Sequence, residues 1–371
     1  LFEKDTRIIQ YSLLKNIEFD ELEYYLKEDI YFLIKCRKLR ILTHLEKREN
    51  YSGSNGEINI YYLDKDLESL DLNKSILHCS LPPSLKYFQS LRQHLSINFL
   101  KGLKNIEVLK IYFTDINEDI DHLRKLRVLR AEIINGKLPD SLKEVSVTII
   151  NTLLPKNLLV LEASEYKYSI PSNIKELRGW ITENANEEEL RNIKSLKEVN
   201  ILNQQRLKSL PRSIEILHIG SDYAKNLDLS KFNNLRELKL YTLCSLTLNK
   251  LPESLKSLSF IFNGKELLDL QEKEFEFLIL PKVSKNININ SKTLIAEDLD
   301  ACINNLGSKI KTLSMTLRNT IPNRKYPNIT TLTINITNNI DTLEKLLLAF
   351  PNLRTLNIKC EDNNKPLNYL P

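Results

Sequence analysis

Residue types that often carry out chemistry occur in this chain, but their spacing does not bring them together. The eight glycines form neither a GxGxxG motif nor a P-loop, so no motif that cradles a phosphate is present. No two histidines have the HxxxH or HExxH spacing of a metal site, and we expect them to be surface or strand residues: His44, His78, His94, His122 and His218. The sequence therefore predicts no bound cofactor and no metal.

Carboxylates are abundant but are spread along the chain rather than paired. Acid and base catalysis needs such groups to converge in one cleft, and nothing in the spacing of these 48 Asp and Glu residues indicates convergence. We therefore predict that the chain is not an enzyme, although a catalytic domain could precede Leu1 in a longer protein.

The cysteines indicate a reducing compartment. They are five in number, lie far apart and form no CxxC pair, so we interpret them as buried or incidental thiols: Cys36, Cys79, Cys244, Cys302 and Cys360. Because the chain begins at Leu1 rather than Met, a signal peptide could have been removed, and secretion stays open. The net charge of +5 is a weak basic bias. No stretch reaches the roughly 20 unbroken apolar residues that would span a membrane.

A six-residue phrase recurs along the chain: apolar, two variable, apolar, one variable, and small or apolar. Clear copies begin at Leu67, Ile106, Leu126, Leu142, Leu158, Leu196, Ile214, Leu235 and Leu255. Weaker or later copies begin at Leu39, Leu85, Ile174, Phe275, Ile310, Ile329 and Leu353. We expect one more unit between Ile287 and Leu299.

The end of each phrase has the alternation of a short strand with one buried face. One such strand cannot cover its own apolar face, whereas many stacked in parallel bury a continuous core. Parallel pairing requires the chain to return to the same edge, so the intervening residues must form the opposite side. Prolines support this register, since they fall two or three residues before the first apolar position, where an N–H is not needed: Pro82, Pro139, Pro155, Pro171, Pro211, Pro252, Pro327 and Pro351.

The phrase resembles the leucine-rich repeat, and the resemblance covers the chain from about Leu39 to Ile358. It implies an α/β solenoid, a horseshoe with a parallel concave β-sheet and an irregular convex side. The Leu-Pro-x-Ser-Leu-x-x-Leu copies at Leu138 and Leu251 look like the short units of bacterial effectors and of amoebal and giant-virus repeat proteins. The amino-acid composition, which is rich in Asn, Ile and Lys, is similar to that of proteins from parasites with AT-rich genomes, including microsporidia.

The departures from the family pattern predict an irregular curvature. Four units, beginning at Leu126, Leu142, Leu158 and Ile174, are only 16 residues apart, which leaves no room for a convex helix. Longer units predict short helices over Glu187–Ile193, behind an Asn186 cap, and over Asp341–Phe350. The family's Asn at the ninth position is mostly absent, and in some units it is replaced by Ser75, Thr114, Asp222 and Thr337.

The domain organisation follows from the extent of the repeat. We expect residues 1–38 to form a helical N-terminal cap, because an open sheet edge invites aggregation and terminal repeats need a cover. Residues 39–360 are expected to form the solenoid of about 16–17 units, and residues 361–371 a C-terminal tail.

The variable residues beside the second apolar position are expected to form two columns on the concave face. In the first half these columns contain a mixed apolar and basic strip: Tyr87, Val108, Val128 and Val160, with Lys110, Arg130 and Arg178. Apolar and Arg residues on a solvated sheet are typical of an interface core, although the same residues also simply favour strands. We therefore expect a protein partner on this face, and the sequence leaves its identity and the oligomeric state open.

A third column, directly after the first apolar position, is often basic, with members such as Arg40, Lys86 and Arg127. It could follow a phosphate backbone, but four acidic residues interrupt it, which argues against nucleic acid: Glu68, Glu107, Glu215 and Glu276. Two further functions stay open. One is the substrate-recognition part of an F-box ubiquitin ligase, although residues 1–38 contain no convincing F-box. The other is a secreted parasite effector or surface protein that engages a host molecule.

Overall fold

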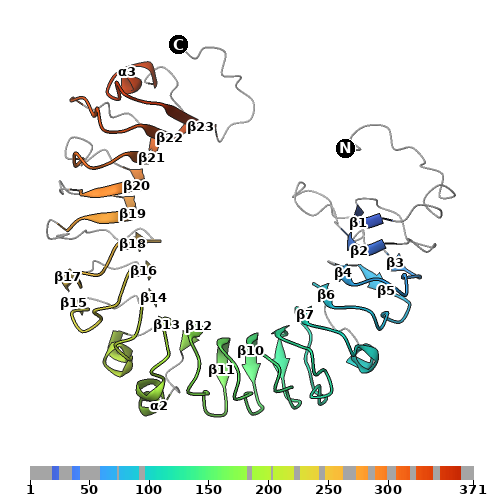
Figure 1. Cartoon of the computed structure of the whole chain (residues 1–371). Helices are drawn as coiled ribbons and strands as arrows, with labels where there is room; N and C mark the ends of the chain where they lie inside the picture. The colour runs from blue at the N-terminus through green and yellow to red at the C-terminus, as the bar shows by residue number, and fades with distance from the viewer. Residues whose placement is uncertain are drawn as a thin grey trace, which may run out of the picture. The chain divides into compact units, whose positions relative to one another are not determined.

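The computed structural model describes residues 19–24, 36–41, 59–72, 75–91, 97–181, 186–201, 204–220, 226–241, 247–261, 273–282, 289–298, 306–317, 323–336 and 343–360. The chain divides into two compact units, Leu1–Gly179 and Trp180–Pro371. Each unit is a solenoid built of successive coils. Each coil contributes one strand to the main sheet, and this strand pairs in parallel with the strand of the next coil (Figure 1).

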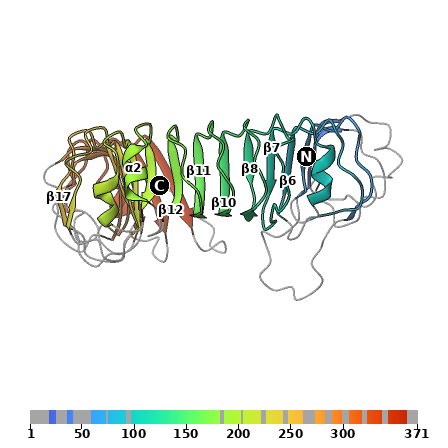
Figure 2. The ribbon, with the colours of Figure 1, turned by 90° about the horizontal axis from the view of Figure 1, so that it is seen from below.

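The main sheet of the first unit contains β1 (Phe19–Tyr24), β2 (Cys36–Ile41), β4 (Ser69–Asp71), β6 (Tyr87–Ser90), β7 (Val108–Ile111), β8 (Val128–Arg130), β10 (Glu144–Ile150), β11 (Val160–Tyr166) and the first four residues of β12 (Glu176–Ile181). Strands β6 to β12 of this sheet stand side by side in Figure 2. Shorter elements complete the turns: β3 (Asn59–Ile60) paired with β5 (Ile76–Leu77), β9 (Ile133–Ile134) paired with the end of β10, and the 3₁₀ helix η1 (Ile97–Gly102).

The main sheet of the second unit contains β13 (Glu198–Ile201), β14 (Ile216–Gly220), β16 (Glu237–Tyr241), β18 (Ser257–Phe260), β19 (Phe275–Lys282), β20 (Ser291–Asp298), β21 (Thr312–Leu317), β22 (Thr331–Ile336) and β23 (Thr355–Cys360). Its other elements are α2 (Glu187–Asn192), η2 (Gln204–Ser209), α3 (Leu343–Leu347), and the pair β15 (Asn226–Asp228) and β17 (Thr247–Lys250). Helix α2 lies on the outer side of this unit, away from its main strands (Figure 1).

The register of the strands places the second apolar residue of each phrase beside that of the next phrase. In the first unit this row is Leu39, Leu70, Phe88, Leu109, Leu129, Val145, Leu161 and Leu177, and none of these side chains is more than 4% exposed. The row continues in register within the second unit from Val199 to Leu356. The predicted parallel solenoid is confirmed, including the expected unit between Ile287 and Leu299, which is β20.

The N-terminal end differs from the prediction. Residues 1–38 were expected to be helical, but the described residues in this range, 19–24 and 36–38, form strands, and the helical cap is not shown. Leu22 lies beside Leu39, and Leu39 lies beside Leu70. Leu39 is therefore the second apolar residue of a copy of the phrase that begins at Cys36. The three-residue spacing from Phe19 to Leu22 fits both a helix and the strand-forming phrase. This segment forms a strand because pairing with β2 supplies hydrogen-bond partners for its backbone N–H and C=O groups.

The secondary structure between the main strands agrees with the spacing of the repeated phrases. The stretch 126–176, which is described throughout, contains strands and turns but no helix, as the 16-residue spacing predicts. Helix α2 follows the predicted cap, and the Asn186 side chain accepts a hydrogen bond from the Glu188 N–H at 3.0 Å. Helix α3 lies within the range predicted for the last helix, whose first two residues are outside the described chain.

The Leu-Pro-x-Ser-Leu motif ties each coil to the one before it. The Pro139 carbonyl accepts from the Leu142 N–H at 3.2 Å, which closes a turn that uses no proline N–H. The Ser141 hydroxyl donates to the Leu126 carbonyl of the preceding coil at 2.7 Å. Three other serines in the same position bond to the preceding coil in the same way: Ser84, Ser213 and Ser254. Each motif therefore shapes its own turn and also satisfies a backbone carbonyl of the neighbouring coil.

The substitutes for the family's Asn do not repeat its role. Ser75 and Thr114 are 0% and 2% exposed, and neither hydroxyl has a hydrogen-bond partner among the described residues. Asp222 and Thr337 lie outside the described residues. These two coils are held by packing and backbone bonds rather than by a side chain at this position.

One glycine lies where two neighbouring coils approach each other closely. A Cβ at Gly136 would collide with the backbone carbonyl of Glu118 in the preceding coil. We expect Gly136→Ala to lower the free energy of unfolding by about 1–3 kcal/mol, because the two backbones must move apart. Gly102→Ala is the matched control, since a Cβ there meets nothing within 4 Å. Urea unfolding curves that coincide for the two variants would contradict this packing.

A half-buried histidine is expected to give the second unit a pH dependence. His218 on β14 is flanked in register by Asn200 and Lys239, and its Nε2 atom is buried with no partner among the described residues. Burial, reinforced by the positive charge of Lys239 and opposed by Glu237, lowers the pKa of His218 from 6.5 to about 4.

The sign of the effect follows from this shift. The unfolded chain binds a proton at His218 near pH 6.5 and the folded chain only near pH 4, so the neutral imidazole stabilises the fold above pH 6.5 and this stability is lost as the pH falls toward 4. His218→Gln should therefore make the free energy of unfolding decline less steeply over this interval, as measured by urea unfolding at a series of pH values. The exposed histidine variant His122→Gln is the control. An unchanged decline in His218→Gln would contradict the assignment.

Candidate functional site

The candidate site is the face of the first unit's sheet that points away from the core. Buried and half-buried side chains alternate along β6 and β7, so every second residue faces outward. In Figure 1 these strands line the inner side of the first unit's arc. The register confirms the two predicted columns, one of Ser69, Tyr87, Val108, Val128, Glu144, Val160 and Glu176, the other of Asp71, Gln89, Lys110, Arg130, Ser146, Glu162 and Arg178.

Five of the seven predicted site residues lie together on β6, β7 and β8. Tyr87, Val108 and Val128 are direct neighbours in one column, and Lys110 and Arg130 are direct neighbours in the other. The Lys110 Nζ atom lies 5.4 Å from the centre of the Tyr87 ring, a cation–π contact. We name these five residues the first-unit strip.

The other two predicted residues stand apart from the strip. Glu144 separates Val160 from Val128 in the first column. Arg178 is three strands from Arg130 in the paired order and forms an ion pair with Glu176 on its own strand, at 2.5 Å. The apolar and basic surface is therefore shorter than the sequence indicated.

Arg130 is the most strongly held cation of the strip. Its Nη1 donates to the Tyr112 hydroxyl at 3.2 Å, and its Nη2 lies 3.6 Å from Glu144. The bond to Tyr112 raises the pKa of the Arg130 guanidinium above its ordinary value. Its Nε–H is buried and has no acceptor among the described residues. Tyr112 was missed by the sequence analysis, and its only signal is that it directly follows the last apolar residue of its phrase.

Asp71, which stands beside Gln89 next to the strip, already has partners. The Tyr87 hydroxyl donates to Gln89 at 2.7 Å, and Gln89 donates to Asp71 at 3.3 Å. Asp71 also lies 3.6 Å from the Arg40 guanidinium. Burial and the charge of Asp71 raise the pKa of Tyr87, so its hydroxyl remains a neutral donor. Lys110, by contrast, has no carboxylate partner within the described part of the chain.

The third column is a ladder of mixed charge rather than a basic strip. The corrected register places Arg37, not Arg40, in this column. Arg37 lies 3.6 Å from Asp20 and 3.1 Å from Glu68, and Lys86 lies 3.1 Å from Glu68. Two similar pairs occur in the second unit, Lys197 with Glu215 at 2.7 Å and Lys256 with Glu276 at 3.0 Å. These acidic residues reduce the positive charge that the column presents.

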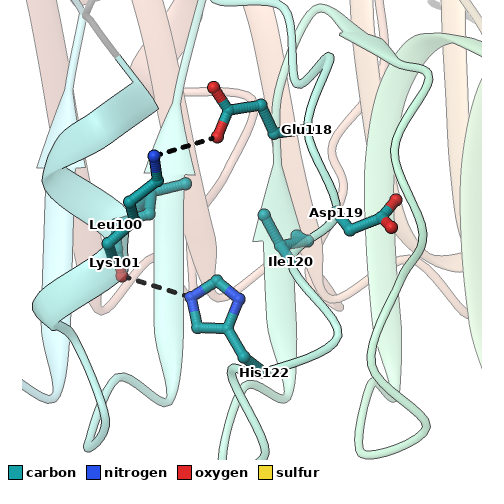
Figure 3. A pocket seen from close by; sticks show the side chains of 6 residues that line it. All are labelled: Leu100, Lys101, Glu118, Asp119, Ile120 and His122. Carbon is teal, nitrogen blue, oxygen red and sulfur yellow. Dashed lines mark hydrogen bonds and ion pairs between the residues drawn. The ribbon is translucent and has the colours of Figure 1, made fainter.

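A shallow hollow of about 290 Å³ lies beside η1 and is shown in Figure 3. Lys101 pairs with Glu118 at 3.8 Å, and His122 Nε2 contacts the Leu100 carbonyl at 3.5 Å. The Asp119 carboxylate points away from His122. The titratable groups around this hollow do not converge on one point, as an acid and base pair would have to.

The described residues contain no group of three or more His, Cys, Asp or Glu side chains that could hold a metal ion. Among them no helix is long and apolar enough to cross a membrane. Cys36 is buried and Cys79 half-buried, both as free thiols. Burial, with a contribution from Asp64, raises the pKa of Cys36 to about 12. The side chains of the other three cysteines lie outside the described part.

Comparisons with known proteins give distant likenesses. No family model and no curated protein matches the chain. An internalin from Listeria monocytogenes is 16% identical over 76% of this chain and 82% of that chain, with a TM-score of 0.32. A leucine-rich-repeat protein from Leptospira interrogans is 16% identical over 92% of this chain and 90% of that chain, with a TM-score of 0.38. The recurring phrase and the parallel register themselves describe a β-solenoid consistent with a leucine-rich-repeat protein.

Proposed function

We propose that this chain is a non-enzymatic scaffold that binds a protein partner on the sheet face of its first unit, through the first-unit strip. The observation that carries the proposal is the uninterrupted apolar column of Tyr87, Val108 and Val128, which faces away from the core beside two cations. The solvated face of a sheet is usually polar, so such a column favours an interface.

The apolar part of the strip supplies the driving force. All three side chains are half-buried, so they keep surface that a partner can remove from water. Each Å² of apolar surface covered contributes about 25 cal/mol. Tyr and Arg, both present in the strip, are among the residue types on which interfaces most depend.

The basic part of the strip sets the chemistry of the partner. Lys110 has no carboxylate partner among the described residues, and the buried Arg130 Nε–H has no acceptor there. An unsatisfied buried donor costs about 1–3 kcal/mol, which a re-aimed guanidinium could recover by binding an incoming carboxylate. The complementary partner is therefore a protein segment that places an acidic residue among apolar ones.

Selection from a displayed library of random peptides tests this directly. Peptides selected on the wild-type chain should carry an Asp or Glu beside apolar residues. The Lys110→Glu, Arg130→Glu double variant should bind them at least about tenfold more weakly, because the two introduced carboxylates repel the acidic residue that the cations attract. Arg178→Glu alone should have a smaller effect, since Arg178 lies apart from the strip.

The matched control is Lys311→Glu, Arg354→Glu, which makes the same charge change on exposed residues of the second unit. This control should bind the selected peptides as the wild type does. Equal loss in both double variants would show a nonspecific charge effect and contradict the site. Circular dichroism spectra that match the wild type establish that all variants are folded.

A further inference from the structure

The residue that follows β7 and Tyr112 has an unusual backbone. Phe113 has a φ of 59°, and it is the only residue other than glycine with a positive φ in the described part of the chain. Glycine and asparagine adopt this left-handed conformation readily, whereas for a bulky side chain it is strained. A glycine here would be the simplest solution for the turn alone.

The neighbours of Phe113 hold it in this conformation. On one side, the Tyr112 N–H donates to the Ser90 carbonyl of the preceding coil at 3.1 Å. On the other side, Thr114 is 2% exposed, and its carbonyl accepts from the Glu132 N–H of the next coil at 3.0 Å. Both flanking residues are fixed by adjacent coils, so the chain between them has to take the left-handed turn whatever side chain it carries.

Packing does not explain why that side chain is aromatic. The Phe113 side chain is 52% exposed, so it contributes only in part to the apolar interior. Single exposed apolar residues are common and carry no argument by themselves. An exposed aromatic ring kept at a strained position is a different matter, because such strain persists mainly where it serves a function.

Its position connects Phe113 to the first-unit strip. The adjacent residue, Tyr112, accepts the hydrogen bond from Arg130 at 3.2 Å. Phe113 is thus one residue away from a side chain that touches the strip, at the end of the strand that carries Val108 and Lys110.

We infer that Phe113 is an aromatic anchor for the partner, placed at the edge of the first-unit strip. This inference rests on the proposed function and adds to it the shape of the bound segment. The partner's acidic residue meets Lys110 and Arg130, and an apolar side chain next to it covers the Phe113 ring. Aromatic anchors of this kind often dominate binding energy.

The test uses Phe113→Gly in the full chain, because glycine removes the ring and relieves the strain together. Peptides selected on the wild-type chain are the probe. The variant should bind them at least about tenfold more weakly. Its thermal midpoint should stay within about 2 °C of the wild type or rise. Leu348→Gly is the control, since Leu348 is 69% exposed in a turn of the second unit, and it should leave peptide binding unchanged.

Each outcome separates this inference from the proposed function. Unchanged binding by Phe113→Gly, together with lost binding by Lys110→Glu, Arg130→Glu, overturns the anchor and leaves the strip intact. A thermal midpoint lowered by more than about 5 °C makes Phe113 a structural residue and also overturns the anchor. If no peptides are enriched on the wild-type chain, both the anchor and the proposed function fail.

Discussion

The structure depends on one contact, the lateral meeting of the second apolar residue of each phrase with its equivalents in the coils on either side. A single coil cannot bury this side chain by itself. The last described strand shows the effect: Leu332 on β22 has a neighbour on both sides and is 0% exposed, whereas Leu356 on β23 is flanked among the described residues by β22 alone and stays half-buried. The serine bonds between coils and the close approach at Gly136 follow from this stacking, because both require neighbouring backbones at a fixed distance.

The same register also determines the outer face of the sheet. Once Leu109 and Leu129 are aligned inside, Val108 and Val128 are aligned outside, and so are Lys110 and Arg130. The columns that we propose as a binding surface are therefore a consequence of how the core is built. Their chemistry is free to vary from coil to coil, since none of these side chains is needed to bury the core. This freedom explains why an apolar and basic strip occurs over only a few strands.

Much of the fold could be predicted from the sequence, because the phrase reports the burial of a strand directly. This prediction fails where the periodicity of a helix and that of a strand fit the same residues. The segment at Phe19 suited a helix as well as a strand, and only the pairing with β2 decided between them. Taking Leu39 as the first apolar residue rather than the second displaced Arg40 from its true column. The site shows a different limit: Tyr112 and the strained Phe113 lie in a turn whose conformation is imposed by neighbouring coils, and no local pattern reports such a constraint.

Distances between spin labels test the stacking most directly. With one label at Lys86 and a second at Lys143 or Lys175, all exposed and in one column, the labels lie three or five strands apart in the paired order. A strand spacing of about 4.8 Å predicts separations of about 14 Å and about 24 Å. Distances that increase in this way with each added strand would support strands that are stacked in sequence order. Equal distances for the two pairs, or a shorter one for Lys175, would contradict it.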